Sequence, residues 1–175
     1  MEKSIKLYDD FLPATLMHGI WITATRENYK KENQDLVSDY GITNTPRPKW
    51  RANLNVGNSI IDEFVDNVLK VSTYKKVAAV YYNYSTFSDV DLIHTDTAAS
   101  VESETALYYC NLNWSREFGG ETFFYDYEQK ELNQVIEYKP NRLIIFDGRI
   151  PHCARPPTIA AAQGRYTLAV KLMKE

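Results

Sequence analysis

The chain has 175 residues, a mass of 20.2 kDa and a formal net charge of −3, and 44% of its residues are hydrophobic. These values suit one globular domain over residues 1–175 and exclude a disordered chain or a fibrous repeat. Acidic and basic residues are interleaved, which argues against a nucleic-acid partner. The sequence has neither a signal-peptide core nor a long apolar run, so we expect a cytoplasmic protein without a membrane partner.

The N-terminal part predicts a helix within residues 9–34. Asp9 or Asp10 can cap this helix through a side-chain oxygen. Pro13 suits the first helical turn, because a proline there loses no hydrogen bond.

A loop and a second helix follow. Residues 36–50 combine glycine and proline with polar residues, which predicts an exposed loop, and its end at residues 49–51 could border a substrate groove. Apolar residues recur at helical spacing from Asn58 to Leu69, which predicts an amphipathic helix packed on a sheet. The helical support therefore spans about residues 9–72.

The remainder, about residues 75–172, is a series of short runs rich in β-branched and aromatic residues. The predicted strands are 77–84, 105–111, 121–125, 134–138, 142–146 and 165–172. Helices followed by a block of strands predict an α+β fold, in which the helices support one face of an antiparallel sandwich or barrel. Cys110 and Cys153 are too few for a disulfide framework and are predicted to be reduced thiols.

Three residues are of the types that bind metal ions in proteins. His94 and Asp96 are two positions apart, so on an extended backbone both side chains point from the same face. His152 follows Pro151, which stiffens the chain before it. Two imidazoles and one carboxylate leave the opposite coordination positions open, as in non-haem iron(II) oxygenases. The alternatives are a solvated strand end for the first pair and a structural histidine for His152.

A second candidate site lies in the last predicted strand. Alternation places Arg165, Thr167 and Ala169 on one face. An inward guanidinium needs an anion, and it can hold a carboxylate through two parallel hydrogen bonds while a threonine hydroxyl donates another. The alternative is an outward arginine on an edge strand.

These residues together resemble the H-x-D, distal H and R-x-S/T signature of 2-oxoglutarate-dependent iron(II) oxygenases. Further segments are similar to the prolyl 4-hydroxylase branch of that family, namely 10–13, 107–114, 118–122, 141–146 and 151–152. The resemblance implies a double-stranded β-helix, or jelly-roll, core with supporting N-terminal helices.

The resemblance also implies the cofactors and the roles of individual residues. Fe(II) would be bound by His94, Asp96 and His152, and the cosubstrates would be 2-oxoglutarate and dioxygen (O2), with ascorbate as a candidate reductant. The reaction would be hydroxylation of a prolyl or related substrate, coupled to decarboxylation of 2-oxoglutarate to succinate. The substrate would be a peptide, a protein or a small molecule, and the sequence leaves the oligomeric state open.

The cosubstrate would be held by residues of three strands. By the resemblance Arg165 would pair with its distal carboxylate, assisted by Thr167 and by the hydroxyl of Tyr109. Tyr82 and Tyr84 share a strand face, and either could line the same pocket, Tyr82 being preferred.

Two departures from the family pattern leave alternatives open. The link from His152 to Arg165 is longer than usual, which makes Arg155 a rival anion ligand. Neither residues 35–51 nor residues 85–93 match a known peptide-binding element closely enough to name proline as the substrate. A zinc-dependent hydrolase using the same two histidines and one aspartate, or a non-catalytic jelly-roll binding module, are the rival functions.

Overall fold

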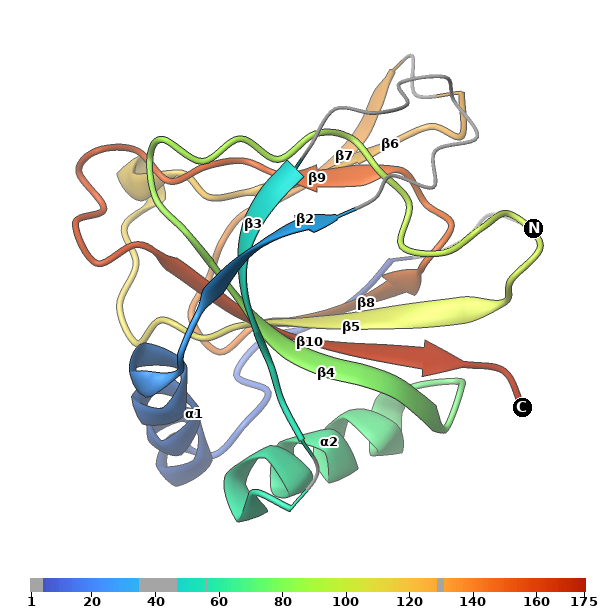
Figure 1. Ribbon diagram of the computed structural model, residues 1–175, viewed down its shortest axis with the longest axis horizontal. Coiled ribbons are helices and arrows are strands. Elements are labelled where there is room, and N and C mark those ends of the chain that lie inside the picture. Colours follow the sequence, from blue (N-terminus) through green and yellow to red (C-terminus); the bar gives the residue numbers. More distant parts are fainter. Residues whose placement is uncertain (1–4, 35–46, 56, 129–130) are drawn as a thin grey trace.

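The computed structural model describes residues 5–34, 47–55, 57–128 and 131–175. The described strands form two antiparallel sheets, and two helices lie against the outer face of the larger sheet (Figure 1). The larger sheet has the strand order β1-β8-β5-β10-β4-β3-β2 and the smaller one β7-β6-β9. The helices are α1 (Ala14–Arg26) and α2 (Ser59–Val71), and the strands are β1 (Lys6–Tyr8), β2 (Lys30–Gln34), β3 (Arg47–Asn53), β4 (Lys76–Ser85), β5 (Ser103–Tyr109), β6 (Thr122–Tyr125), β7 (Leu132–Ile136), β8 (Leu143–Asp147), β9 (His152–Ala154) and β10 (Arg165–Met173).

Helix α2 confirms the helix predicted from Asn58 onward. The side chain of Asn58 accepts a hydrogen bond from the backbone N–H of Ile60 at 3.0 Å and so caps the first turn. Ile61, Phe64 and Val68 are buried at a spacing of three and four residues, which turns one apolar stripe toward the sheet.

Helix α1 is shorter than the prediction. Pro13 occupies the cap position rather than the first turn, and no side chain caps this helix. Asp9 instead binds Arg142, with its Oδ1 2.6 Å from the arginine Nε. Residues Lys30–Gln34 form β2 rather than a continuation of the helix, because their backbone pairs with β3.

The six predicted strands are all present, with shifts of one to two residues at most ends. The prediction missed β1, β2, β3 and β9. Residues 47–50 were predicted as loop but lie in β3, which pairs with β4. The rest of that predicted loop, residues 36–46, falls outside the described residues. No helix in the described part of the chain is long and apolar enough to cross a membrane.

Strand β10 lies between β4 and β5 and separates two environments. Tyr166, Leu168, Val170 and Leu172 point to the helices, and Leu168 and Val170 are fully buried there. Residues Arg165, Thr167, Ala169 and Lys171 alternate with them and line the cavity between the sheets. The predicted alternation of this strand is therefore correct.

The outer face of the large sheet carries the main apolar core. Phe64 of α2 and Ile20 of α1 pack with Tyr82, Tyr108 and Leu168, all fully excluded from solvent. Burying a side chain of this size stabilises the fold by about 1.5–3 kcal/mol. This core fixes the sheet, whose inner face then presents the polar residues described below.

Candidate metal and anion site

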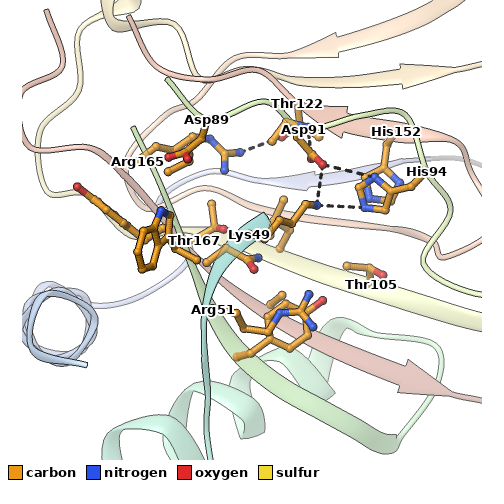
Figure 2. Close-up of a pocket in the computed structure, with 18 of the residues that line it drawn as sticks. Lys49, Arg51, Asp89, Asp91, His94, Thr105, Thr122, His152, Arg165 and Thr167 are labelled. Atoms are coloured by element: carbon orange, nitrogen blue, oxygen red, sulfur yellow. Dashed lines mark hydrogen bonds and ion pairs between the residues drawn. The ribbon is translucent and has the colours of Figure 1, made fainter. Parts of the chain in front are cut away.

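A cavity of about 810 Å³, including its open mouth, lies between the two sheets. Strands of the large sheet contribute one wall, and β6, β9 and the chain around residues 89–96 contribute the other. Figure 2 shows His94 and His152 side by side in this cavity, with Arg165 and Thr167 on the opposite side of the view. The three proposed metal ligands and the proposed anion anchor therefore share one space.

The three metal-ligand candidates converge. One ligand atom from each of His94, Asp96 and His152 lies within 4.8 Å of the others. The Nε2 atom of His94 is 3.8 Å from Asp96 Oδ1, and that of His152 is 3.6 Å from Asp96 Oδ2. Among the residues that the structure describes, this is the single group of three or more such side chains.

Backbone pairing brings the ligands together, although His94 and Asp96 are not in a regular strand. His94 and His152 form an isolated antiparallel bridge with reciprocal N–H to carbonyl bonds of 2.9 and 2.8 Å. The N–H of Asp96 donates to the carbonyl of Gly148 at 2.7 Å. A β-carbon at position 148 would lie 2.4 Å from Ser103 Oγ and 3.0 Å from Thr97 Oγ1, so a larger residue would displace side chains next to Asp96.

Both imidazoles are oriented by a carbonyl two residues earlier in the chain. His94 Nδ1 lies 3.0 Å from the carbonyl of Leu92, and His152 Nδ1 lies 2.8 Å from that of Ile150. Since a carbonyl only accepts, each Nδ1 carries the proton and each Nε2 presents its lone pair to the centre of the site. Burial lowers the pKa of His94 to about 3 and also lowers the pKa of His152, which favours the neutral form that binds metals.

The carboxylate of Asp96 is held in its ionised form. Burial alone would raise the pKa of Asp96, but the nearby charge of Lys171, together with His152, His94 and the hydrogen bond from Lys171, holds this pKa well below its usual range. Thr105 Oγ1 donates to Asp96 Oδ2 at 2.6 Å, and Lys171 forms an ion pair with the same oxygen. Two neutral imidazoles and one carboxylate, with the lone pairs of both Nε2 atoms directed inward, fit a divalent iron.

The second part of the site is built around Arg165, which is only 3% exposed. Its Nε donates to the carbonyl of Gly120 at 2.8 Å, and its Nη2 donates to Thr122 Oγ1 at 3.3 Å. Gly120 has a φ of +81°, and a β-carbon there would lie 3.2 Å from Arg165 Cδ. The guanidinium is thus fixed while no carboxylate balances it among its described contacts.

Thr167 supplies an unused hydroxyl on the same wall. It is 1% exposed, and its Oγ1 has no hydrogen-bond partner among the described residues. A buried hydroxyl without a partner costs about 1–3 kcal/mol, so a ligand in the cavity is expected to bind it. Arg165 and Thr167 both line the cavity, on the inward face that the sequence predicted for them, and their donors could bind a carboxylate.

Of the three tyrosines proposed for the cosubstrate pocket, one lines the cavity and two do not. Tyr109 does not itself line the cavity, because its hydroxyl lies 2.8 Å from Thr122 Oγ1, one layer behind. Tyr82 points to the opposite face of the sheet, where its hydroxyl lies 2.6 Å from Thr23 Oγ1. Tyr84 reaches the cavity at the end of β4 and packs on Tyr166, with ring centroids 4.7 Å apart. Of the two candidates, Tyr84 rather than Tyr82 lines the cavity.

Several polar residues of the cavity were not singled out from the sequence. Asp91 Oδ1 pairs with Lys49 Nζ at 2.8 Å, and that ammonium lies 3.5 Å from His94 Nε2 (Figure 2). Asn83 has a buried amide oxygen with no described partner. Lys171 could have been found by extending the alternation of β10 by two residues beyond Ala169. Arg155, the rival anion ligand, is exposed at the rim, with its Cζ 5.4 Å from the ring centroid of Phe123.

The comparisons agree with this geometry. A model of the 2OG-Fe(II) oxygenase superfamily matches residues 73–170. A prolyl-4-hydroxylase from Pseudomonas putida is similar over 99% of this chain and 94% of its own, with 14% identity and a TM-score of 0.72. A Trichoplax adhaerens prolyl hydroxylase, in complex with a hypoxia inducible factor peptide fragment, is similar over 97% of this chain and 83% of its own, with 19% identity and a TM-score of 0.70.

A third similar structure is HygX from Streptomyces hygroscopicus, solved with nickel and 2-oxoglutarate, at 10% identity and a TM-score of 0.67 over 98% of this chain and 83% of its own. The curated proteins contain no match to the sequence. At these identities the solved structures establish the fold, a double-stranded β-helix, and the family model establishes the family. The chain belongs to the 2OG-Fe(II) oxygenase superfamily, whose cofactors are Fe(II) and 2-oxoglutarate.

Proposed function

We propose that this dioxygenase hydroxylates a prolyl residue of a peptide or protein, or a related small substrate. The observation that carries the oxygenase chemistry is the placement of His94, Asp96 and His152 in one cavity with Arg165 and the unpaired hydroxyl of Thr167. The similarity to two prolyl hydroxylases supports a prolyl substrate.

One part of the cavity would bind iron, and the other would bind 2-oxoglutarate. His94, Asp96 and His152 would hold the iron from one side, because their donor atoms face a common centre. Arg165 and Thr167 would bind the distal carboxylate of 2-oxoglutarate, and Tyr109 would support that carboxylate from behind Thr122. When bound, iron and 2-oxoglutarate activate dioxygen, with release of succinate and carbon dioxide and hydroxylation of a C–H bond of the substrate.

The mouth of the cavity is suited to an extended substrate. Phe87 and Val90 are 57% and 67% exposed on the loop that precedes His94, and Val90 lines the cavity. Trp50 and Arg155 line the same mouth from β3 and from the chain after β9. Apolar and cationic side chains around an opening can hold a peptide while its reactive carbon enters.

The test is succinate formation from 2-oxoglutarate by protein loaded anaerobically with Fe(II) and then exposed to air. We expect native protein to form succinate and His94→Ala to lose this activity, while Arg165→Ala recovers part of it at high 2-oxoglutarate. His18→Ala is the matched control, because His18 lies on the exposed side of α1 with its Nδ1 2.8 Å from Ala14 O.

Two further outcomes separate the rivals. If native protein binds iron but neither binds nor converts 2-oxoglutarate, the oxygenase proposal is wrong, and hydrolysis by zinc-loaded protein becomes the next assay. If succinate forms, proline-containing peptides are screened by mass spectrometry for addition of one oxygen atom. Turnover of 2-oxoglutarate without modification of any such peptide would contradict the prolyl assignment and leave the dioxygenase assignment in place.

A further inference from the structure

Lys171 is a buried cation beside the metal-ligand candidates, and the function proposed above assigns it no role. It lies on the inner face of β10, with only 17% of its side chain exposed. Its ammonium forms an ion pair with Asp96 Oδ2 and donates to Thr105 Oγ1 at 2.9 Å. A positive charge next to the binding site of a divalent cation repels that cation, so a specific task is needed to explain it.

The partner of Lys171 lies directly across the sheet. Lys171 and Thr105 are paired in the antiparallel register of β10 and β5, so both side chains project from the same inner face. Thr105 Oγ1 accepts from Lys171 and donates to Asp96 Oδ2 at 2.6 Å. Two neighbouring strands therefore deliver two donors to the same carboxylate oxygen.

The two oxygens of Asp96 are unequal as a result. The hydrogen bonds that the described residues donate to this side chain end on Oδ2. Both oxygens lie near an imidazole, Oδ1 at 3.8 Å from His94 Nε2 and Oδ2 at 3.6 Å from His152 Nε2, but Oδ1 accepts no hydrogen bond among the described contacts. An oxygen that already accepts two donors, one of them charged, is a weaker metal ligand than its unengaged neighbour.

We propose that Lys171, acting with Thr105, is a positioning residue that restricts Asp96 to one metal-binding oxygen. A carboxylate that bound iron through both oxygens would take a coordination position needed by 2-oxoglutarate or dioxygen. The lysine thus keeps that position open, and it does so at the expense of metal affinity. This inference rests on the proposed function, because it concerns the same iron site.

The proposal predicts that the affinity for 2-oxoglutarate falls while the affinity for the metal does not. Lys171→Met removes the charge and one donor, so Co²⁺, used as a probe for the iron site, should bind as tightly as in native protein or more tightly. Binding of 2-oxoglutarate to the Co²⁺-loaded variant should weaken by about 10-fold or more, which is about 1.4 kcal/mol or more, because a second oxygen of Asp96 would compete for its coordination position. A residue that only supports the fold would weaken both.

Thr105→Val separates the hydrogen bond from the charge. It removes the other donor to Oδ2 but leaves the ammonium, so 2-oxoglutarate binding should weaken while Co²⁺ binding does not tighten. Lys174→Met is the matched control, since Lys174 pairs with Glu102 on the surface and is 62% exposed. Thermal unfolding of each protein without metal confirms that the variants are folded.

The measurements are titration calorimetry with Co²⁺, then with 2-oxoglutarate, and the visible absorption of bound Co²⁺, which reports coordination number. Weaker 2-oxoglutarate binding with undiminished Co²⁺ binding supports the proposal. Equal losses of both, or no change in either, overturn it while the proposed function stands. If native protein binds neither Co²⁺ nor 2-oxoglutarate, the proposed function fails and this inference fails with it.

Discussion

The two faces of the seven-stranded sheet are made from the same strands but hold opposite kinds of side chain. On the face toward the helices, Leu168 and Val170 of β10 are fully buried among aromatic and aliphatic residues. On the face toward the cavity, Arg165, Thr167 and Lys171 of the same strand meet polar groups. The apolar face supplies stability, which allows the polar face to keep groups that are costly to bury until a ligand binds them.

The largest effect is expected on the cavity side. His152→Ala removes one of the three candidate metal ligands, so iron binding and succinate formation should fall to background, while the fold is retained because the pairing of residues 94 and 152 uses backbone atoms. Activity and iron content are measured together. Full activity in this variant would show that the cavity face does not carry the metal site as proposed.

A substitution on the helix face should lower the stability of the fold without changing the binding of 2-oxoglutarate. Leu168 is fully buried between the sheet and the helices, so Leu168→Ala should lower the free energy of unfolding by about 3 kcal/mol. Urea denaturation measures this loss. The KM for 2-oxoglutarate should be unchanged in the folded fraction, and a changed KM would mean that packing on the outer face controls the cavity.

Two tyrosines allow a closer comparison of the faces, because a change to phenylalanine removes only one hydroxyl from each face. Tyr82 has its hydroxyl 2.6 Å from Thr23 Oγ1 on the helix face, so Tyr82→Phe should lower stability by about 1 kcal/mol and leave the KM unchanged. Tyr109→Phe, behind Thr122 on the cavity face, should raise the KM for 2-oxoglutarate. Equal effects of the two variants on the KM would contradict the assignment of Tyr82 to the core.

The smallest effect is expected outside both faces, where Asp9 joins the N-terminal segment to Arg142. The hydrogen bond from Arg142 lowers the pKa of Asp9 to about 2, below the value of about 3.9 for an unfolded aspartate. A depressed pKa in the folded state stabilises the protein above the unfolded value, and this contribution is lost as the pH falls from about 5 to about 2.

Because 38% of the Asp9 side chain is exposed, solvent screens the pair and Asp9→Asn should cost less than about 1 kcal/mol near neutral pH. Unfolding free energies of native protein and variant, measured across that pH range, should converge at its acid end. A difference that persists unchanged at about pH 2 would contradict the origin assigned to it.

The sequence was sufficient where a pattern is local. The apolar spacing in α2 and the alternation in β10 were enough to predict the buried side of each, and the positions of Arg165 and Thr167 followed. The ligand set of His94, Asp96 and His152 was identified by resemblance and by residue chemistry, and these residues do lie together in the structure.

The sequence was insufficient where the pairing of strands decides which residues face the cavity or which segments form strands. Alternation in β4 separates Tyr82 from Asn83 but does not tell which of them faces the cavity. That depends on the register Asn83↔Thr167, since paired residues share a face. In the same way, the polar segment Lys30–Gln34 becomes a strand through its pairing with β3, and no local apolar pattern marks it.

Residues of strand β6 support both ends of the cavity. Thr122 contacts the guanidinium of Arg165, and Phe124, two positions further, pairs with His152. Two residues of extended chain span about 7 Å. The spacing between the two backbone positions that support these ends is therefore set by the geometry of an extended strand. We therefore expect a keto diacid one methylene shorter or longer than 2-oxoglutarate to bind this site less tightly.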